Sequence, residues 1–402
     1  MVTTSKTIAS PARFLNPDHP IRSLSIAFWV YKSILLLIIA CSPGPGYDTS
    51  TALFAYQTPN ASDVGLQQST SHPPPLPSLL KFVRWDAIYY VHTAENGYVY
   101  EQEWAFGYGY SRILALLTSV LHRLGGLGGV PTIALVAVVL SHVAHYLSVL
   151  ALYRLSANVF GLDNPKQKIV CFLSAALHII SPAGAFLSAP YGEALFSFLN
   201  ITGFYAYSSS LLDTSAERAL SSSVKLLLAS GLFSVATTVR SNGVISGFLY
   251  AYDAVLLLYR ILTHGPSKNA CIRLIATIIG GCVVGFGMIL PQAIAYADFC
   301  LATLPPRPWC EKLIPSIYGW GSWVPPILDF IKPSALLFSV AHVVHTLLVL
   351  SMGTKSDTFS GSSTHWPAHV VSFDGLIPRQ NSSPPGFTRR TSFHQLPCPN
   401  YQ

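Results

Sequence analysis

A tryptophan–aspartate pair stands out among the side chains that could do acid–base chemistry. Asp86 directly follows Trp85, in a polar segment that also contains Glu95. A carboxylate just past a tryptophan at a membrane interface is suited to removing a proton from a hydroxyl group. The same pattern also fits a structural role, in which Trp85 anchors the interface and Asp86 caps the following helix. Both interpretations stay open on these residues alone.

Two further motifs carry polar groups at the edges of apolar segments. Proline and glycine around Tyr191 and Glu193 break one helix and start the next, which predicts Glu193 in a first helical turn. A helix N-terminus favours an anion there, so capping alone would explain this glutamate. Arg240 and Asn242 lie in a short connection between two apolar segments. The arginine is suited to binding a phosphate, and snorkelling toward the interface is the alternative.

The remaining candidates concern metals, disulfides and glycans. His142 and His145 are three residues apart, but no third ligand lies near them in sequence, so helix packing is favoured over a metal site. Cys300 and Cys310 flank a proline-rich loop and are candidates for a disulfide. Asn60 begins an Asn-Ala-Ser glycosylation sequon. The sequence predicts no metal site, and it leaves a role for a divalent ion open.

The composition decides what kind of scaffold must position these groups. Of 402 residues, 51% are apolar and only 10% are charged, and the mean hydropathy is +0.45. A soluble globule of this size needs more charge to cover its surface, and a disordered chain has far fewer apolar residues. Lysine and arginine are not clustered, which argues against nucleic acid as a partner. We therefore predict an all-α polytopic membrane protein.

Apolar stretches of suitable length mark the expected spans. About 20 residues cross the hydrocarbon core, and we expect spans at 24–41, 130–153, 169–187, 194–212, 226–239, 244–262, 275–296 and 335–350. The stretch 113–124 is too short and predicts a re-entrant or surface helix. The first segment is not expected to be a cleaved signal peptide, because its apolar run is long and no small-residue cleavage site follows.

The distribution of basic residues predicts the orientation of these spans. Residues 1–23 contain three lysines and arginines and are expected on the cytosolic side, whereas the acidic loop 42–112 is expected on the far side. Alternation then places 84–112, 181–193, 240–243 and 298–318 on one non-cytosolic face. Polar groups that converge at one face indicate either an enzyme or a small-solute transporter with its opening there. The enzyme is favoured, because no internal repeat is seen and the polar cluster lies at the membrane edge.

Taken together, six motifs resemble the family of glycosylphosphatidylinositol (GPI) mannosyltransferase 2. The resemblance runs from about residue 21 to 318, and its motifs are 84–86, 94–101, 105–106, 181–186, 240–243 and 307–310. One departure is Gly-Tyr-Gly-Tyr after Phe106, where the family has a further aromatic residue and a proline; it looks like a fungal variant. The resemblance implies a fungal C-type glycosyltransferase fold in the endoplasmic reticulum membrane. It also implies dolichyl phosphate mannose as donor, an α-1,6 linkage formed on the lumenal side, and a small membrane partner subunit.

This resemblance assigns roles to the candidate residues. A β-linked donor and an α-linked product imply inversion, which needs a base, a stabilised oxocarbenium-like transition state and a neutralised leaving phosphate. We expect Asp86 as the base and Arg240 at the phosphate. Glu193, Tyr191 and Asn242 are expected to position sugar hydroxyls, and Trp85 and Glu95 complete the substrate-binding set. Another dolichyl-phosphate-sugar-dependent transferase is the alternative; the lipid substrates would be dolichyl phosphate mannose and mannosyl-glucosaminyl-phosphatidylinositol.

Beyond Tyr318 the resemblance is expected to stop because of a shifted reading frame. The family carries a segment like V-G-F-L-R-Y-W-T-x-x-N-x-P at this point, whereas the chain reads S-W-V-P-P-I-L-D-F-I-K-P-S-A-L from residue 322. Permitted codons for those residues, read one base later, translate as V-G-F-L-R-Y-W-T-L-S-N-L-P-L. We therefore expect a polytopic catalytic domain at 24–318 with its lumenal loop at 42–112, followed by an aberrant, largely disordered tail at 319–402. A genuinely divergent disordered tail is the alternative.

The reading-frame hypothesis predicts the result of transcript sequencing. Complementary DNA across codons 319–336 should contain the family segment in the neighbouring frame, through a mis-assigned intron or a one-base slip. If none of the three frames of the transcript encodes that segment, the tail is genuine and the hypothesis is wrong.

Overall fold

The computed structural model describes residues 16–43, 50–51, 54, 78–125, 128–182, 184–302 and 307–311. The chain divides into two compact units, residues 1–354 and 355–402. The second unit, the predicted span 335–350, the sequon at Asn60 and the tail from residue 319 lie outside the described residues. The description that follows concerns the first unit.

Every regular element in the described part of the first unit is helical. The α-helices are α1 (Pro20–Cys41), α2 (Ala87–Asn96), α3 (Tyr108–Arg123), α4 (Val130–Phe160), α5 (Pro165–Ile179), α6 (Glu193–Ser215), α7 (Ala219–Val239), α8 (Phe248–His264) and α9 (Lys268–Tyr296). Short 3-10 turns occupy Ser78–Phe82, Glu101–Phe106 and Ser241–Gly247, and a π-helical turn, Ala297–Leu301, extends α9. This confirms the predicted all-α class.

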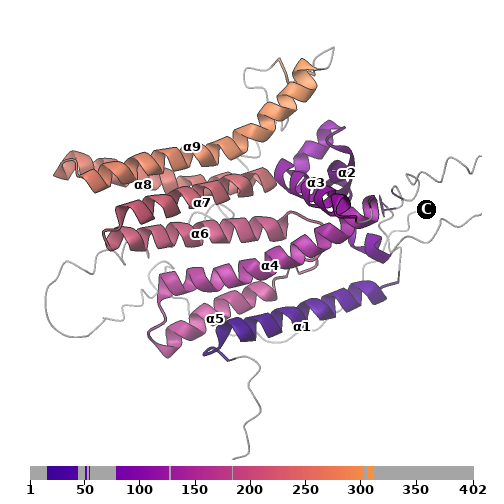
Figure 1. The fold of residues 1–402 in the computed structure, drawn as a ribbon, viewed down its shortest axis with the longest axis horizontal. Helices are drawn as coiled ribbons and strands as arrows, with labels where there is room; N and C mark the ends of the chain where they lie inside the picture. The colour runs from indigo at the N-terminus through magenta and orange to yellow at the C-terminus, as the bar shows by residue number, and fades with distance from the viewer. Residues whose placement is uncertain are drawn as a thin grey trace, which may run out of the picture. The chain divides into compact units, whose positions relative to one another are not determined.

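Five of the described helical segments are long and apolar enough to cross a membrane. They are Pro20–Cys41, Val130–Phe160, Ala219–Val239, Ser241–His264 and Lys268–Leu301, and each corresponds to a predicted span. The long helices lie side by side in Figure 1. Their outer surface exposes many large apolar side chains, as expected for helices that face lipid.

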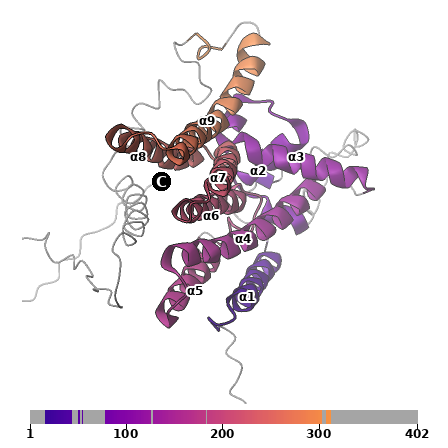
Figure 2. The same cartoon turned by 60° about the vertical axis from the view of Figure 1, so that its left-hand side comes forward.

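Two predicted spans differ from the helices that form. The stretch 169–187 is not one span, because α5 has only 15 residues and ends at Ile179. The described residues of 180–192 then form irregular turns, with Pro182 and Pro190 among them. Helix α6 has 23 residues but contains many serines and one aspartate. It packs against α4 on one side and α7 on the other (Figure 2), so neighbouring helices shield these polar groups.

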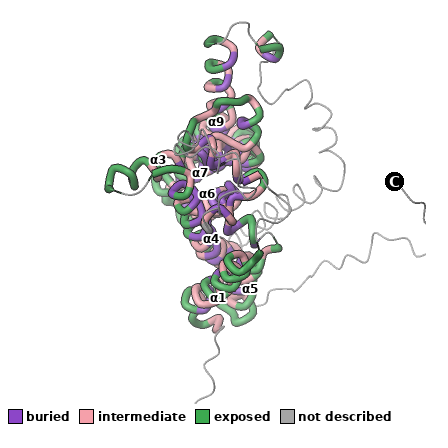
Figure 3. The backbone as a smooth tube through the Cα atoms, turned by 90° about the vertical axis from the view of Figure 1, so that its right-hand side faces the viewer, coloured by how far each residue is buried: buried purple, intermediate pink, exposed green. Residues whose placement is uncertain are grey.

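Close helix packing in the centre depends on small residues. Gly203 on α6 faces the Phe233 ring of α7, and a Cβ atom built at Gly203 would lie 2.6 Å from that ring. Gly287 on α9 similarly faces the backbone of Ser234 on α7. The buried residues are concentrated along this contact, as the purple segments of α4, α6 and α7 show (Figure 3). The interface therefore leaves no space for a larger side chain at Gly203.

The polar connections gather at one end of the bundle. Helices α1, α5, α7 and α9 end there, and α6 begins there. The short helices α2 and α3 cross this end, at the right of Figure 1. Helix α3 has 16 residues and exposes several leucines, which fits the predicted surface helix. At the opposite end lie the basic residues Arg154, Lys166, Arg218 and Lys268, near the helix ends that the sequence assigns to the cytosol.

The α6–α7 contact generates a stability prediction. In Gly203→Ala the added methyl group must displace the buried Phe233 ring, so we expect a loss of about 1–3 kcal/mol in the free energy of unfolding. Thermal unfolding of the detergent-solubilised protein measures it. Gly231→Ala on α7 is the matched control, because a Cβ there meets no atom within 4 Å. Equal unfolding temperatures for the two variants would contradict this packing.

Candidate active site

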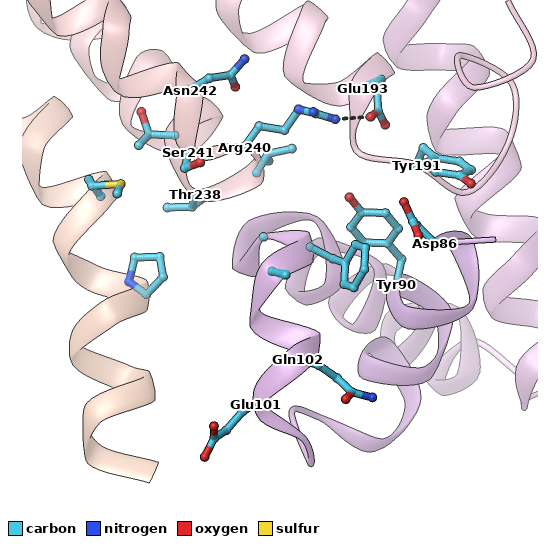
Figure 4. A pocket seen from close by; sticks show the side chains of 18 residues that line it. Asp86, Tyr90, Glu101, Gln102, Tyr191, Glu193, Thr238, Arg240, Ser241 and Asn242 are labelled. Atoms are coloured by element: carbon cyan, nitrogen blue, oxygen red, sulfur yellow. Dashed lines mark hydrogen bonds and ion pairs between the residues drawn. The ribbon is translucent and has the colours of Figure 1, made fainter. Parts of the chain in front are cut away.

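A cavity of about 880 Å³ opens at the polar end of the bundle. Its wall comes from the start of α2, the turn Glu101–Phe106, the start of α6, the end of α7 with the following 3-10 turn, and the C-terminal third of α9 (Figure 4). The polar side chains on this wall are Asp86, Tyr90, Glu101, Gln102, Tyr191, Glu193, Thr237, Thr238, Arg240, Ser241 and Asn242. Five of the seven predicted catalytic and substrate-binding residues thus share one cavity.

Asp86 occupies the N-cap position of α2, but its side chain does not cap the helix. The preceding residue, Trp85, has a φ of 53°, a left-handed conformation that a bulky side chain adopts only at a cost of about 1–3 kcal/mol. This sharp turn leaves Asp86 exposed on the cavity wall, beside Tyr90 and Tyr191 in Figure 4. No side chain in the described part of the molecule donates a hydrogen bond to its carboxylate. The capping interpretation of Asp86 is therefore wrong in this structure.

Glu193 and Arg240 form an ion pair that joins two helix ends. Glu193 is the first residue of α6, and its Oε1 atom accepts from Nη1 of Arg240, the residue that directly follows α7 (Figure 4). The other carboxylate oxygen, Oε2, is buried and has no partner among the described residues. Arg240 is the only lysine or arginine on the described cavity wall. Neither alternative from the sequence accounts for this contact. Helix capping does not explain why Glu193 binds Arg240, and snorkelling does not explain why Arg240 binds Glu193.

Tyr191 contributes through the turn before α2. Its hydroxyl group donates to the Arg84 carbonyl oxygen at 3.0 Å, and its ring packs edge-on against Phe186 and Tyr90. The hydroxyl proton is therefore engaged by protein, and only the oxygen lone pairs can face a substrate. Tyr191 holds the backbone that carries Trp85 and Asp86, in addition to forming part of the wall.

Several cavity residues were not anticipated, and Tyr90 is the clearest of them. It follows Asp86 by four residues on α2, so the two side chains share a helix face, and this spacing could have identified it. Burial is the main reason why the pKa of Tyr90 lies well above its usual value, with the nearby Glu193 charge adding to the effect. Tyr90 is therefore a neutral phenol at any physiological pH. Ser241 lies within the motif 240–243 but was assigned no role, and Gln102 and Thr238 were not singled out in the sequence.

Two predicted substrate-binding residues do not line the cavity. Trp85 is 54% exposed and lies outside the wall. Glu95 is nine residues after Asp86 on α2, which is half a turn out of phase, so it faces the opposite side near the other end of the helix. Burial raises the pKa of Glu95, and the His92 charge opposes the shift. Their sequence proximity to Asp86 did not imply a shared site.

The turn Glu101–Phe106, which forms part of the cavity wall, is held by contacts with neighbouring segments. Buried Glu103 accepts from the Val99 and Tyr100 amides at 2.7 and 2.9 Å, and it contacts His92 Nδ1 at 2.6 Å. Glu101 pairs with Arg307 at 2.8 Å. A disulfide joins the two cysteines flanking the proline-rich loop, Cys300 and Cys310. The turn Glu101–Phe106 is thus fixed to α2 and to the segment that follows α9.

No group of three or more potential metal ligands occurs in the described part of the chain. His142 and His145 are buried on α4; His142 Nδ1 contacts the Val138 carbonyl oxygen and His145 Nε2 contacts that of His178. Their surroundings are those of helix packing.

Comparison with known proteins assigns this architecture to a family. The family model described as mannosyltransferase (PIG-V) matches residues 26–331, about three quarters of the chain. The chain belongs to the PIG-V mannosyltransferase family. Because this is a family of glycosyltransferases, the chain is an enzyme. The comparison therefore does not support the transporter interpretation. The match ends at residue 331, compared with 318 expected from the motifs.

Individual relatives agree with the family. The chain is 58% identical over 306 residues to the GPI mannosyltransferase 2 of Aspergillus oryzae, which covers 76% of this chain and 66% of the relative. It is 50% identical over 341 residues to the same enzyme of Aspergillus fumigatus, which covers 84% and 69%. The GPI alpha-1,6-mannosyltransferase 2 of Cricetulus griseus is 32% identical over 259 residues, which covers 61% and 48%. The chain thus spans about two thirds of the length of its Aspergillus relatives, and the high identity supports the predicted fungal origin.

The Glu193–Arg240 pair generates a prediction about stability. The two side chains are 30% and 40% exposed, so the pair should stabilise the fold by about 1 kcal/mol. Arg240→Ala leaves a partly buried carboxylate unpaired, and we expect it to lower the thermal unfolding midpoint more than the double variant Glu193→Ala, Arg240→Ala does. If the double variant lowers the midpoint by the sum of the decreases in Glu193→Ala and Arg240→Ala, the ion pair contributes nothing to stability.

Proposed function

We propose that this chain adds the second mannose of the GPI anchor, forming an α-1,6 linkage with dolichyl phosphate mannose as donor. Two things support the proposal: the activities named for its relatives and the arrangement of the cavity. The observation that carries it is that, among the described residues, a carboxylate without a hydrogen-bond partner, Asp86, and one cation, Arg240, lie on the wall of the same cavity. A proton acceptor and an anion-binding group are what transfer from a sugar phosphate requires.

The stereochemistry sets what the cavity must do. A β-linked mannosyl phosphate that gives an α-mannoside reacts by one displacement at the anomeric carbon. The acceptor hydroxyl oxygen forms the new bond as the bond to the phosphate oxygen breaks. The hydroxyl proton passes to a base, and the electron pair of the broken bond stays with dolichyl phosphate. Base and phosphate site must therefore lie on opposite sides of the sugar ring.

Asp86 is suited to be the base of this reaction. Its carboxylate is exposed to the cavity and accepts no side-chain hydrogen bond from the described residues, so both oxygens are available. The rigid turn at Trp85 fixes where the carboxylate points, which reduces the loss of conformational freedom on binding. In the reaction it takes the proton of the acceptor hydroxyl.

Arg240 is suited to bind the leaving phosphate. The pairing with Glu193 uses one of five guanidinium N–H groups, which leaves donors for phosphate oxygens. The contact with Glu193 holds the Arg240 guanidinium at the cavity wall when no dolichyl phosphate mannose is bound. The free Oε2 of Glu193 and the Asn242 amide are suited to bind mannose hydroxyls. A buried acceptor without a partner strongly favours a ligand that supplies a donor.

We place this reaction at the lumenal face of the endoplasmic reticulum membrane. Arg154, Lys166, Arg218 and Lys268 lie at the end of the bundle opposite the cavity, and lysine and arginine prefer the cytosolic side. In this orientation the Cys300–Cys310 disulfide and the Asn60 sequon are both lumenal, where disulfides form and glycans are attached. A small membrane partner subunit is part of the same proposal. In this scheme the polytopic catalytic domain comprises residues 24–318.

Replacing the proposed base tests the mechanism. Asp86→Asn keeps the size of the side chain but cannot accept the proton, so we expect second-mannose transfer to fall by about 10²–10⁴-fold. The measurement is transfer from radiolabelled dolichyl phosphate mannose in microsomes of a strain that lacks its own enzyme. Glu95→Gln is the matched control, because that carboxylate lies on the same helix outside the cavity, and it should retain near-normal activity.

The lipid intermediates of the same cells identify the reaction. Cells that carry only Asp86→Asn should accumulate the single-mannose precursor. Full activity of Asp86→Asn at normal protein level would remove Asp86 as the base. Accumulation of a different intermediate would favour the alternative, another dolichyl-phosphate-sugar-dependent transferase. A cytosolic location of residue 86 in topology mapping would overturn the whole scheme.

A further inference from the structure

A lysine lies completely buried in the middle of the first membrane helix. Lys32 is 0% exposed, although it lies on α1, whose sequence is otherwise almost entirely apolar. An amino group in this environment is costly unless polar atoms surround it. Nothing in the reaction described above uses Lys32, which lies outside the cavity wall. Its position therefore calls for a different explanation.

The partners of Lys32 belong to the irregular loop between α5 and α6. Its Nζ atom donates to the Leu187 carbonyl oxygen at 3.0 Å and to Ser188 Oγ at 2.7 Å. Both loop residues are buried. Nζ also lies 5.7 Å from the centre of the Phe28 ring. No carboxylate in the described part of the chain forms an ion pair with Lys32. Both of its hydrogen bonds to described residues go to the loop between α5 and α6.

The loop needs such donors because it is non-helical at membrane depth. Buried carbonyl groups without partners cost about 1–3 kcal/mol each, and irregular backbone is tolerated there only where protein satisfies it. A second anchor comes from α4, where Ser141 Oγ donates to the Ala189 carbonyl oxygen at 2.8 Å. Ser188 Oγ in turn donates to the Gly184 carbonyl oxygen at 2.8 Å. The loop is thus fastened by α1 and α4 rather than by its own regular structure.

The fastened loop leads directly into the cavity. Two residues after Ala189 comes Tyr191, whose hydroxyl group holds the Arg84 carbonyl oxygen in front of Asp86. Glu193 follows and pairs with Arg240. A continuous set of contacts therefore runs from Lys32 through residues 187–191 to the turn that presents Asp86.

We propose that Lys32 is a positioning residue for the transferase site: by holding residues 187–188, it sets Tyr191 and, through it, the turn that carries Asp86. The inference rests on the proposed function, since it concerns the placement of the proposed base. Lys32 itself touches no substrate. Its removal leaves α1 in place and relaxes the loop.

The test uses the full chain and the microsomal transfer assay. Lys32→Met keeps the length and the apolar stem and removes the donors. We expect kcat per folded molecule to fall at least tenfold, with the KM for dolichyl phosphate mannose changed less than twofold. Lys225→Met is the matched control, since Lys225 bonds Asp213 at 2.7 Å at the opposite end of the bundle, and it should keep the normal kcat.

A double variant separates positioning from a general loss of stability. If Lys32 acts through Tyr191, then Lys32→Met combined with Tyr191→Phe should be no less active per folded molecule than Tyr191→Phe alone. Should Lys32→Met fail to fold, Ser188→Ala removes one loop contact and should lower kcat in the same direction. Losses that multiply in the double variant, or an unchanged kcat in the folded variant, overturn the inference. If these results occur while Asp86→Asn is inactive, only the inference fails; if Asp86→Asn is also active, the proposed function fails.

Discussion

The ion pair between Glu193 and Arg240 is the interaction on which the cavity depends. It joins the start of α6 to the end of α7. At the other end of the same two helices, Asp213 near the end of α6 binds Arg218 and Lys225, each at 2.7 Å. The two most central helices are therefore fastened to each other at both ends by charged contacts. Helix α9 packs against α7 of this pair, whereas α2 packs against α3 and α4.

Because of this pair, two carboxylates in one cavity have different chemical characters. Glu193 is committed to Arg240 through one oxygen, whereas Asp86 has no such partner among the described residues. One oxygen of Glu193 is therefore already occupied, whereas both oxygens of Asp86 are open to a ligand. Both residues are acidic, so the sequence alone does not separate the proposed base from the proposed binding group. Their different roles follow from the helix end that each residue occupies.

Much of this architecture could be predicted from the sequence, for identifiable reasons. Apolar length located the spans, and the bias of lysine and arginine brought Asp86, Glu193 and Arg240 to one end, because both signals depend only on local composition. The prediction for Glu95 failed because it did not take the phase of the helix into account. Glu95 lies close to Asp86 in sequence but faces away from the cavity. Lys32 and Tyr191 owe their roles to partners more than 100 residues away, and no local pattern reports such pairings.

The proline in α9 has a further consequence for the cavity wall. Pro291 lies inside the helix and lines the cavity, as does Gly287 one turn earlier. Proline has no amide hydrogen, so the Gly287 carbonyl oxygen loses the donor that it would meet in an uninterrupted α-helix. This uncharged main-chain acceptor belongs to a residue that lines the same cavity as Asp86 and Arg240. Because this acceptor belongs to the main chain, no exchange of side chains on α9 removes it as long as the proline is kept.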